Sequence, residues 1–197
     1  MSEILRYRFQ QGDVLRLRHT ISQVIDRADD TRLEDQMVLE GTLTVLERLT
    51  DKSARLELTT RMVEPPRLVP WQDQMTAVYH VSHRGELLAA DPVPPVLPFM
   101  TFPIEPVETR RAWKSIEAVS GRPLAMSHTL ARVEVLEGER EVYLVSEGKA
   151  AGEPQVEYCC VTHFALKRGW PTRRRIVITH AFEGQGANAM VIEEEAY

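Results

Sequence analysis

The chain has 197 residues, of which 43% are hydrophobic and 27% are charged, and its formal net charge at pH 7 is −5. This apolar content excludes an intrinsically disordered chain and suffices for one substantial core or two small ones. The negative charge argues against a protein that binds duplex nucleic acid, and no apolar run reaches the roughly 18 residues of a membrane-spanning helix. We therefore expect a globular cytoplasmic protein, or an exported one whose leader has been removed.

Alternation of apolar and polar residues runs through the chain, and convincing helical spacing is absent. At the start, Leu5, Tyr7 and Phe9 alternate with arginines, and a turn at Gly12-Asp13 leads into residues 15–22, which predicts a hairpin with one wet face. Further strands are predicted at 36–48, 54–63, 74–83, 86–90, 111–119, 126–136, 140–147, 155–166, 172–182 and 188–194.

These strands predict an all-β fold, an antiparallel sheet of about ten to twelve strands curled into a barrel or half-barrel. Segment 30–40 leaves an alternative open. Its residues Leu33 and Met37 also fit a short helix, whereas the alternation from Val38 to Val45 favours a strand.

Segment 91–106 holds six of the twelve prolines and cannot donate a regular ladder of hydrogen bonds, so it is expected to be an extended crossover. It also carries Val96, Leu97, Phe99, Met100, Phe102 and Ile104, which are unfavourable in water as one contiguous patch. We expect a strap that covers an open edge or end of the sheet. A wall of a ligand pocket and a docking surface for another subunit are the alternatives.

Two echoes indicate an internal duplication within one domain. Residues 79–85 end in Arg84-Gly85, and residues 163–169 end in Arg168-Gly169, 84 positions later because 168 − 84 = 84. Residues 42–58 likewise match 129–144. We expect pseudo-repeat halves at about 1–90 and 107–197, joined by the crossover 91–106. Neither half is expected to bury its apolar face alone.

No motif for chemistry is evident. Cys159 and Cys160 are adjacent in a predicted strand, so their side chains point to opposite faces and a disulfide between them is not expected. The histidines show no metal-ligand spacing, and no phosphate loop or nucleophile motif is present. We expect no metal, cofactor or catalytic residue. An enzyme stays open only through groups that the fold brings together.

Arg173-Arg174-Arg175 opens a predicted strand, so at least one guanidinium must point to the other face of the sheet. One interpretation is a guard on an edge strand, with partners among Glu193-Glu194-Glu195. The other is an anion site for a carboxylate or phosphate headgroup, carried by Arg173 and Arg175.

The order of features resembles uncharacterised bacterial β-rich proteins of the lipoprotein-carrier half-barrel type. These features are Tyr7-x-Phe9-x-x-Gly12-Asp13, then Leu97-Pro98 to Phe102-Pro103, then Trp113, and a strand ending in Arg168-Gly169. The chain departs from that pattern with Arg110-Arg111 before Trp113, where a Gly-Asp turn would be expected. The resemblance implies a curved antiparallel sheet with an apolar concavity, and it carries over no catalytic residues.

The function that these observations favour is non-catalytic binding of an apolar or amphipathic ligand in the concavity. The predicted contacts are Tyr79, Phe99, Met100, Phe102, Tyr158 and Phe164, with Arg173 and Arg175 for an anionic end. The alternative is a structural or accessory subunit that docks onto a larger protein assembly through residues 91–106 and a sheet edge.

Overall fold

The computed structural model describes residues 2–26, 32–64, 74–92, 99–119, 122–136, 138–150, 156–179 and 188–197. Within them every regular element is a strand, so the all-β prediction is confirmed. No helix of this part of the chain is long and apolar enough to cross a membrane. The strands are β1 (Ser2–Glu3), β2 (Val14–Asp26), β3 (Arg32–Arg48), β4 (Ala54–Glu64), β5 (Gln74–Val81), β6 (Leu87–Asp91), β7 (Val107–Glu108), β8 (Ala112–Val119), β9 (Arg122–Leu136), β10 (Glu139–Lys149), β11 (Glu157–Ala165), β12 (Trp170–Thr179) and β13 (Asn188–Ala196).

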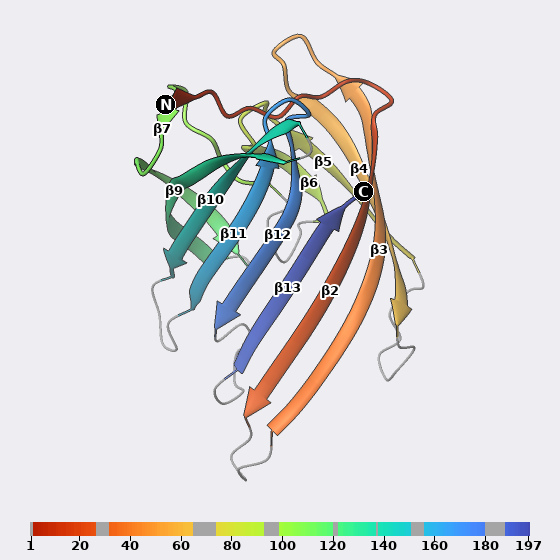
Figure 1. Cartoon of the computed structure of the whole chain (residues 1–197). Helices are drawn as coiled ribbons and strands as arrows, with labels where there is room; N and C mark the ends of the chain where they lie inside the picture. Colours follow the sequence, from red (N-terminus) through yellow and green to blue (C-terminus); the bar gives the residue numbers. More distant parts are fainter. Residues whose placement is uncertain are drawn as a thin grey trace.

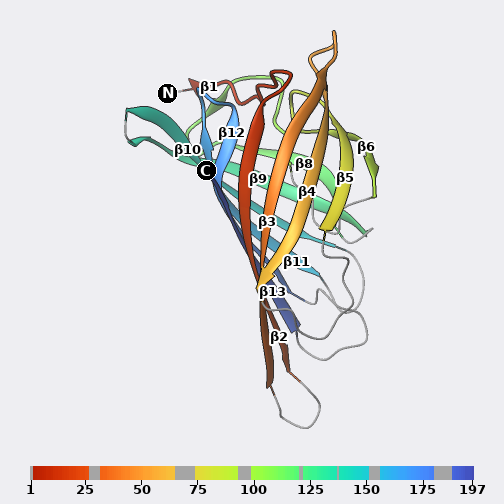
Figure 2. The same ribbon diagram turned by 90° about the vertical axis from the view of Figure 1, so that its right-hand side faces the viewer.

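Eleven of these strands form one antiparallel sheet in the order β6-β5-β4-β3-β2-β13-β12-β11-β10-β9-β8, while β1 pairs with β7 separately. The sheet curls strongly, and its outermost strands β6 and β8 do not pair with each other (Figures 1 and 2). It is therefore an open half-barrel, which is one of the two forms that the sequence left open, and not a closed barrel.

Each half of the chain is a meander of neighbouring strands, β2 to β6 and β8 to β13, and the two are joined where β2 pairs with β13. The Arg-Gly echoes both fall in turns, one between β5 and β6 and one between β11 and β12. Gly85 and Gly169 have φ of 88° and 71°, a conformation that favours glycine. This arrangement is the one that a duplication predicts, and the duplication itself stays a prediction.

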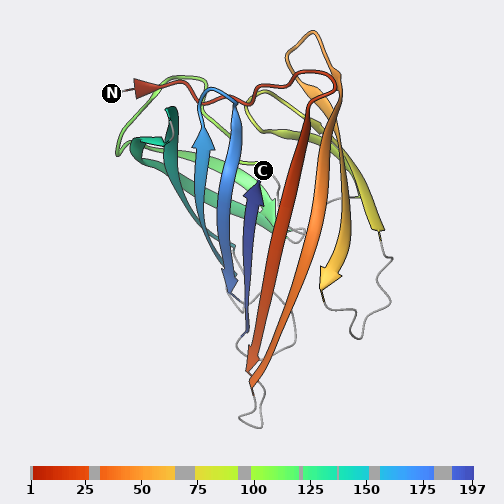
Figure 3. The ribbon, with the colours of Figure 1, turned by 45° about the vertical axis from the view of Figure 1, so that its right-hand side comes forward.

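The predicted hairpin of residues 5–9 with 15–22 is wrong. Residues 4–10 form no strand but run across one end of the sheet (Figure 3), where Tyr7 donates its N–H to the carbonyl of His83 at 2.8 Å. Their alternation reflects burial against that end, since Leu5, Tyr7 and Phe9 are all buried. Strand β2 pairs with β3 and β13 instead. The helix considered for 30–40 does not form either, because β3 spans Arg32–Arg48.

The described part of the strap, residues 99–106, lies across the same end. Its Phe99, Met100 and Phe102 are only 4%, 7% and 1% exposed, which confirms that it covers an end of the sheet. Phe102 exchanges hydrogen bonds with Arg84: its N–H donates to the Arg84 carbonyl at 2.7 Å, and its own carbonyl accepts from Arg84 Nε at 2.9 Å.

We call the cluster beneath the strap and residues 4–10 the upper core. It is rich in aromatic rings from segments distant in sequence, and Tyr7 packs against four of them at centroid distances of 5.1 to 5.9 Å. Its members include Leu5, Tyr7, Phe9, Leu17, Leu43, Leu56, Tyr79, Phe99, Met100, Phe102, Leu130, Leu144, Phe164 and Trp170. The upper core fills the concavity at the strap end of the half-barrel.

Candidate functional site

Away from the strap, the concave face of the sheet continues as an apolar surface that we call the inner wall. Side chains of neighbouring strands share this face because directly paired residues point the same way. Ile176, Ile192, Ile21 and Met37 form one transverse row across β12, β13, β2 and β3. The inner wall also includes Leu39, Met62, Leu124, Met126, Tyr158, Cys160, Ile178 and Met190. Ile21, Met37, Leu39, Met62, Met190 and Ile192 are only half-buried.

Methionine is concentrated on the concave face. Six of the seven methionines lie there: Met100 comes from the strap into the upper core, and Met37, Met62, Met75, Met126 and Met190 lie on the sheet. Methionine is unbranched and polarisable, so it adapts to partners of irregular shape. Gly148 makes room for one of them, because a Cβ at this position would collide with Met126 Sδ.

A charged row separates the upper core from the inner wall. Arg174 of β12 donates to both carboxylate oxygens of Glu194 of β13, from Nε at 2.8 Å and from a terminal guanidinium nitrogen at 2.7 Å. His19 of β2 contacts Glu194 Oε2 through Nε2 at 2.7 Å. Along β12, Trp170 above this row belongs to the upper core, and Ile176 below it belongs to the inner wall.

In this row the ion pair outweighs the effect of burial on the pKa values of Glu194 and Arg174. Burial alone would raise the pKa of Glu194, but the Arg174 charge and the hydrogen bond from His19 outweigh it and lower that pKa to about 2. The same ion pair outweighs burial at Arg174, so its pKa lies above the ordinary arginine value. Both groups are therefore charged at neutral pH. Burial also raises the pKa of the Tyr158 hydroxyl and the Cys160 thiol, which stay protonated.

The arginine run is placed as the sequence predicted in one respect and differently in another. Its partners are the three glutamates, in the register Arg173 with Glu195, Arg174 with Glu194 and Arg175 with Glu193. However, β12 lies between β11 and β13 and is not an edge strand, so the interpretation as an edge guard is wrong. Only Arg174 faces inward. The side chains of Arg173 and Arg175 are 68% and 60% exposed on the outer face. An anion site there stays a prediction.

The six predicted apolar contacts fall into two groups. Tyr79, Phe99, Met100, Phe102 and Phe164 are brought together, but in the filled upper core, where each is buried against the others. Tyr158 is the one that lies on the inner wall. The methionines, His19 and the choice of Arg174 as the inward arginine were missed, although Glu194 was among the expected partners. The sequence shows period-two spacing around Met37, Met126 and Met190, which places each of them on one face of its strand. That spacing does not indicate which face of the sheet is concave.

A second buried polar cluster fastens the strap to the sheet. His128 contacts Ser146 Oγ through Nδ1 at 2.8 Å and Ser115 Oγ through Nε2 at 2.7 Å. Ser146 contacts Met100 Sδ at 3.8 Å, and Trp113 donates to the carbonyl of Thr101 at 2.9 Å. His128 and Ser146 are each 1% exposed, so this cluster has a structural role in holding the strap.

The other chemical groups form no site in the described residues. Cys160 is buried on the inner wall and Cys159 is exposed on the outer face, and both are free thiols, as their opposite directions predicted. No group of three His, Cys, Asp or Glu side chains able to hold a metal ion occurs in the ranges that the structure describes.

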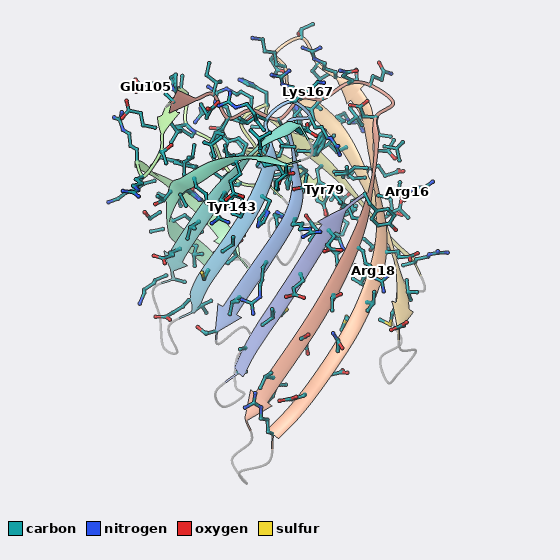
Figure 4. All side chains as sticks on the ribbon, in the orientation of Figure 1. Arg16, Arg18, Tyr79, Glu105, Tyr143 and Lys167 are labelled. Atoms are coloured by element: carbon teal, nitrogen blue, oxygen red, sulfur yellow. The ribbon has the colours of Figure 1, made fainter. Side chains whose placement is uncertain are left out.

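The outer face carries charged side chains together with valines such as Val177 and Val191. Arg16, Arg18 and Tyr143 point outward from it, while Glu105 and Lys167 lie at the strap end (Figure 4). A depression of about 570 Å³ crosses β8 to β12, lined by apolar residues such as Ala125 and Val177 and by charged ones such as Glu147 and Lys149, and Lys149 pairs with Glu157 at 2.6 Å. The inner wall is the surface on which half-buried isoleucine and methionine side chains gather.

The comparisons with known proteins give distant structural similarity alone. No family model and no curated protein matches the chain. A LolA superfamily protein from Nitrosomonas europaea is 13% identical, with 95% of this chain and 86% of that chain covered and a TM-score of 0.26. A DUF1329 family protein from Desulfovibrio piger is 10% identical, with coverages of 93% and 84% and a TM-score of 0.19. The weak resemblance to lipoprotein-carrier-like proteins is confirmed to this extent, and similarity at this level carries no argument about function.

Proposed function

We propose that the protein is a non-catalytic binding protein that holds an apolar or amphipathic ligand against the inner wall. The observation that carries this proposal is the distribution of apolar side chains on the concave face. At the strap end they are closed into a core, whereas Ile21, Met37, Met62, Met190 and Ile192 are left half-buried on a curved surface. A contiguous apolar surface of this kind is a site for a hydrophobic partner.

The predicted ligand residues contribute in two ways within this proposal. Tyr158 contacts the ligand directly from the inner wall, where it lies beside Ile178 in the ladder of β11 and β12. The upper core, with Phe99, Met100 and Phe102 of the strap, closes the concavity above the ligand. Docking of a protein partner through residues 91–106 stays an alternative. In the described part of the strap, the large apolar side chain that such a partner could contact is Ile104, which is 71% exposed.

A pair of neighbouring substitutions in β13 tests the proposal. Ile192 faces the inner wall and Val191 faces outward, so Ile192→Glu puts a charge into the site and Val191→Glu puts the same charge outside it. Binding of the apolar dye N-phenyl-1-naphthylamine is measured by fluorescence titration. We expect Ile192→Glu to weaken binding by about tenfold or more, because the dye must then desolvate a carboxylate, and Val191→Glu to leave it within about twofold.

Native mass spectrometry of protein purified from its own source checks the same point without a dye. The proposal expects a bound mass that organic solvent removes. It is overturned if the dye binds Ile192→Glu and the unsubstituted protein equally while both retain their near-ultraviolet circular dichroism.

A further inference from the structure

His19 is the polar side chain of the charged row that reaches the inner wall. Its side chain is 13% exposed, against 9% for Glu194 and 8% for Arg174. Along β2 its inward-facing neighbours are Leu17 and Ile21, and across the ladder it pairs with Leu39 of β3. A ligand lying on Ile21 and Leu39 therefore meets the His19 ring.

The hydrogen bonds of the row decide where the His19 proton lies. Glu194 is held as a carboxylate by two hydrogen bonds from Arg174, and a carboxylate can only accept. The contact of 2.7 Å between Glu194 Oε2 and His19 Nε2 therefore requires a hydrogen on Nε2. A neutral imidazole has a single N–H, so Nδ1 carries a lone pair and accepts hydrogen bonds. No hydrogen bond joins Nδ1 to the described residues.

The charge of the row also bears on the ligand. Arg174 and Glu194 neutralise each other, so this pair offers no net positive charge to an anionic headgroup. The polar group that the row presents to a ligand is one hydrogen-bond acceptor, His19 Nδ1, next to the apolar side chains of Ile21 and Leu39. A ligand with a hydrogen-bond donor at its polar end satisfies that acceptor, whereas an ether oxygen or a carboxylate of the same size places lone pairs against the lone pair of Nδ1.

We propose that His19 Nδ1 is the polar subsite of the inner wall and accepts a hydrogen bond from an uncharged amphiphile that ends in a hydroxyl group. This inference rests on the proposed function, because it supposes that the apolar part of the ligand lies on the inner wall. It adds the chemistry of the ligand's polar end and the residue that selects it.

The test compares dodecan-1-ol with its isomer 1-methoxyundecane as displacers of N-phenyl-1-naphthylamine at one fixed, mildly alkaline pH. The two probes have the same atoms, but only the alcohol donates a hydrogen bond. We expect the alcohol to displace the dye at a concentration about three- to tenfold lower, as one net hydrogen bond allows. Dodecanoate is expected to be weaker than the alcohol.

Two variants assign the preference to His19. His19→Phe removes the acceptor and is expected to abolish the difference between alcohol and ether. In His19→Gln the amide nitrogen can donate to Glu194 while the amide oxygen accepts from the ligand, so the preference should return. His163→Phe, on the outer face next to Tyr143, is the matched control and should keep the full preference.

The outcomes separate this inference from the function on which it rests. If the dye binds and both probes displace it equally, or if His19→Phe keeps the preference for the alcohol, the assignment of His19 is wrong while an apolar site remains. A better displacement by dodecanoate than by the alcohol also overturns it. If neither the dye nor any probe binds, the proposed function itself fails.

Discussion

Arg174 and Glu194 are charged groups on the mainly apolar concave face, and the structure shows what makes their burial tolerable. Each is less than a tenth exposed, and their contact is bidentate, so neither charge is left without a partner. The flanking pairs Arg173 with Glu195 and Arg175 with Glu193 have the same composition but lie in solvent. Pairs of identical chemistry therefore differ in energetic importance because of the face to which each belongs.

We predict that Glu194→Gln lowers the free energy of unfolding by about 3–5 kcal/mol at pH 7, because it leaves a buried guanidinium without its counter-charge. Glu193→Gln, whose side chain is 58% exposed in the unsubstituted protein, is the control and should change it by less than about 1 kcal/mol. Urea unfolding followed by fluorescence measures both. A loss at Glu194 no larger than at Glu193 would show that the buried pair is not stabilising.

From the lowered pKa of Glu194 we predict how the stability of the protein depends on pH. The pKa of Glu194 is lowered from 4.5 to about 2 by folding, so its contribution is complete above about pH 4.5 and is lost as the pH falls toward 2. The difference in unfolding free energy between the unsubstituted protein and Glu194→Gln should therefore shrink between pH 5 and about pH 2. A difference that stays constant over that interval would contradict the assignment of a charged Glu194.

At the scale of elements, the strap and residues 4–10 act as one cover over the end of the half-barrel. Met100 donates its N–H to the Tyr7 hydroxyl at 3.0 Å, and Arg6 donates to the carbonyls of Pro103 and Ile104. Gly85 lies directly below, where a Cβ would collide with the carbonyl of Met100. These contacts tie the cover to the β5–β6 turn, so the strap contributes to the fold as well as to the shape of the concavity.

We predict that Phe102→Ala destabilises the protein by about 3–5 kcal/mol, because this ring is 1% exposed and packs at 5.0 Å from the Phe164 ring. Ile104→Ala, two residues further along the strap and 71% exposed, should change stability by less than about 0.5 kcal/mol. Thermal unfolding by calorimetry compares the two. Equal small losses would mean that the strap is not part of the cooperative core.

At the scale of the whole molecule, the two meanders share one sheet and one core. The pairing of β2 with β13 runs over nine residue pairs, from Asn188 with Ile25 to Ala196 with Leu17. The N-terminal segment also crosses between the halves, since Tyr7 packs edge-to-face against Phe164 and Trp170 of the second half. The upper core is thus assembled from residues at both ends of the chain, which supports the prediction that the chain is one domain.

We predict that a fragment of residues 1–92 does not fold by itself, because β2 would lose its β13 partner and the upper core would lose its second half. Near-ultraviolet circular dichroism and urea unfolding of the fragment should show no cooperative transition, while co-expression with residues 93–197 should restore one. A cooperative transition in the isolated fragment would contradict the single-domain prediction.

The sequence by itself determined the all-β class and most strand positions, because alternation with period two is a local property. Residues 4–10 are the exception, since they alternate without forming a strand. The sequence also identified the strap and the arginine–glutamate partners. It did not determine which arginine faces inward: Ile176, Val177 and Ile178 are all apolar, so alternation in β12 does not distinguish the two faces.

Only the tertiary structure decided that residues 4–10 cross the end of the sheet and that the predicted aromatic contacts fill a core. It also decided that Met37, Met62, Met126 and Met190 share one face with His19. The reason is physical. Curvature and register bring together residues from opposite ends of the chain, and neither is encoded in the spacing of any single strand.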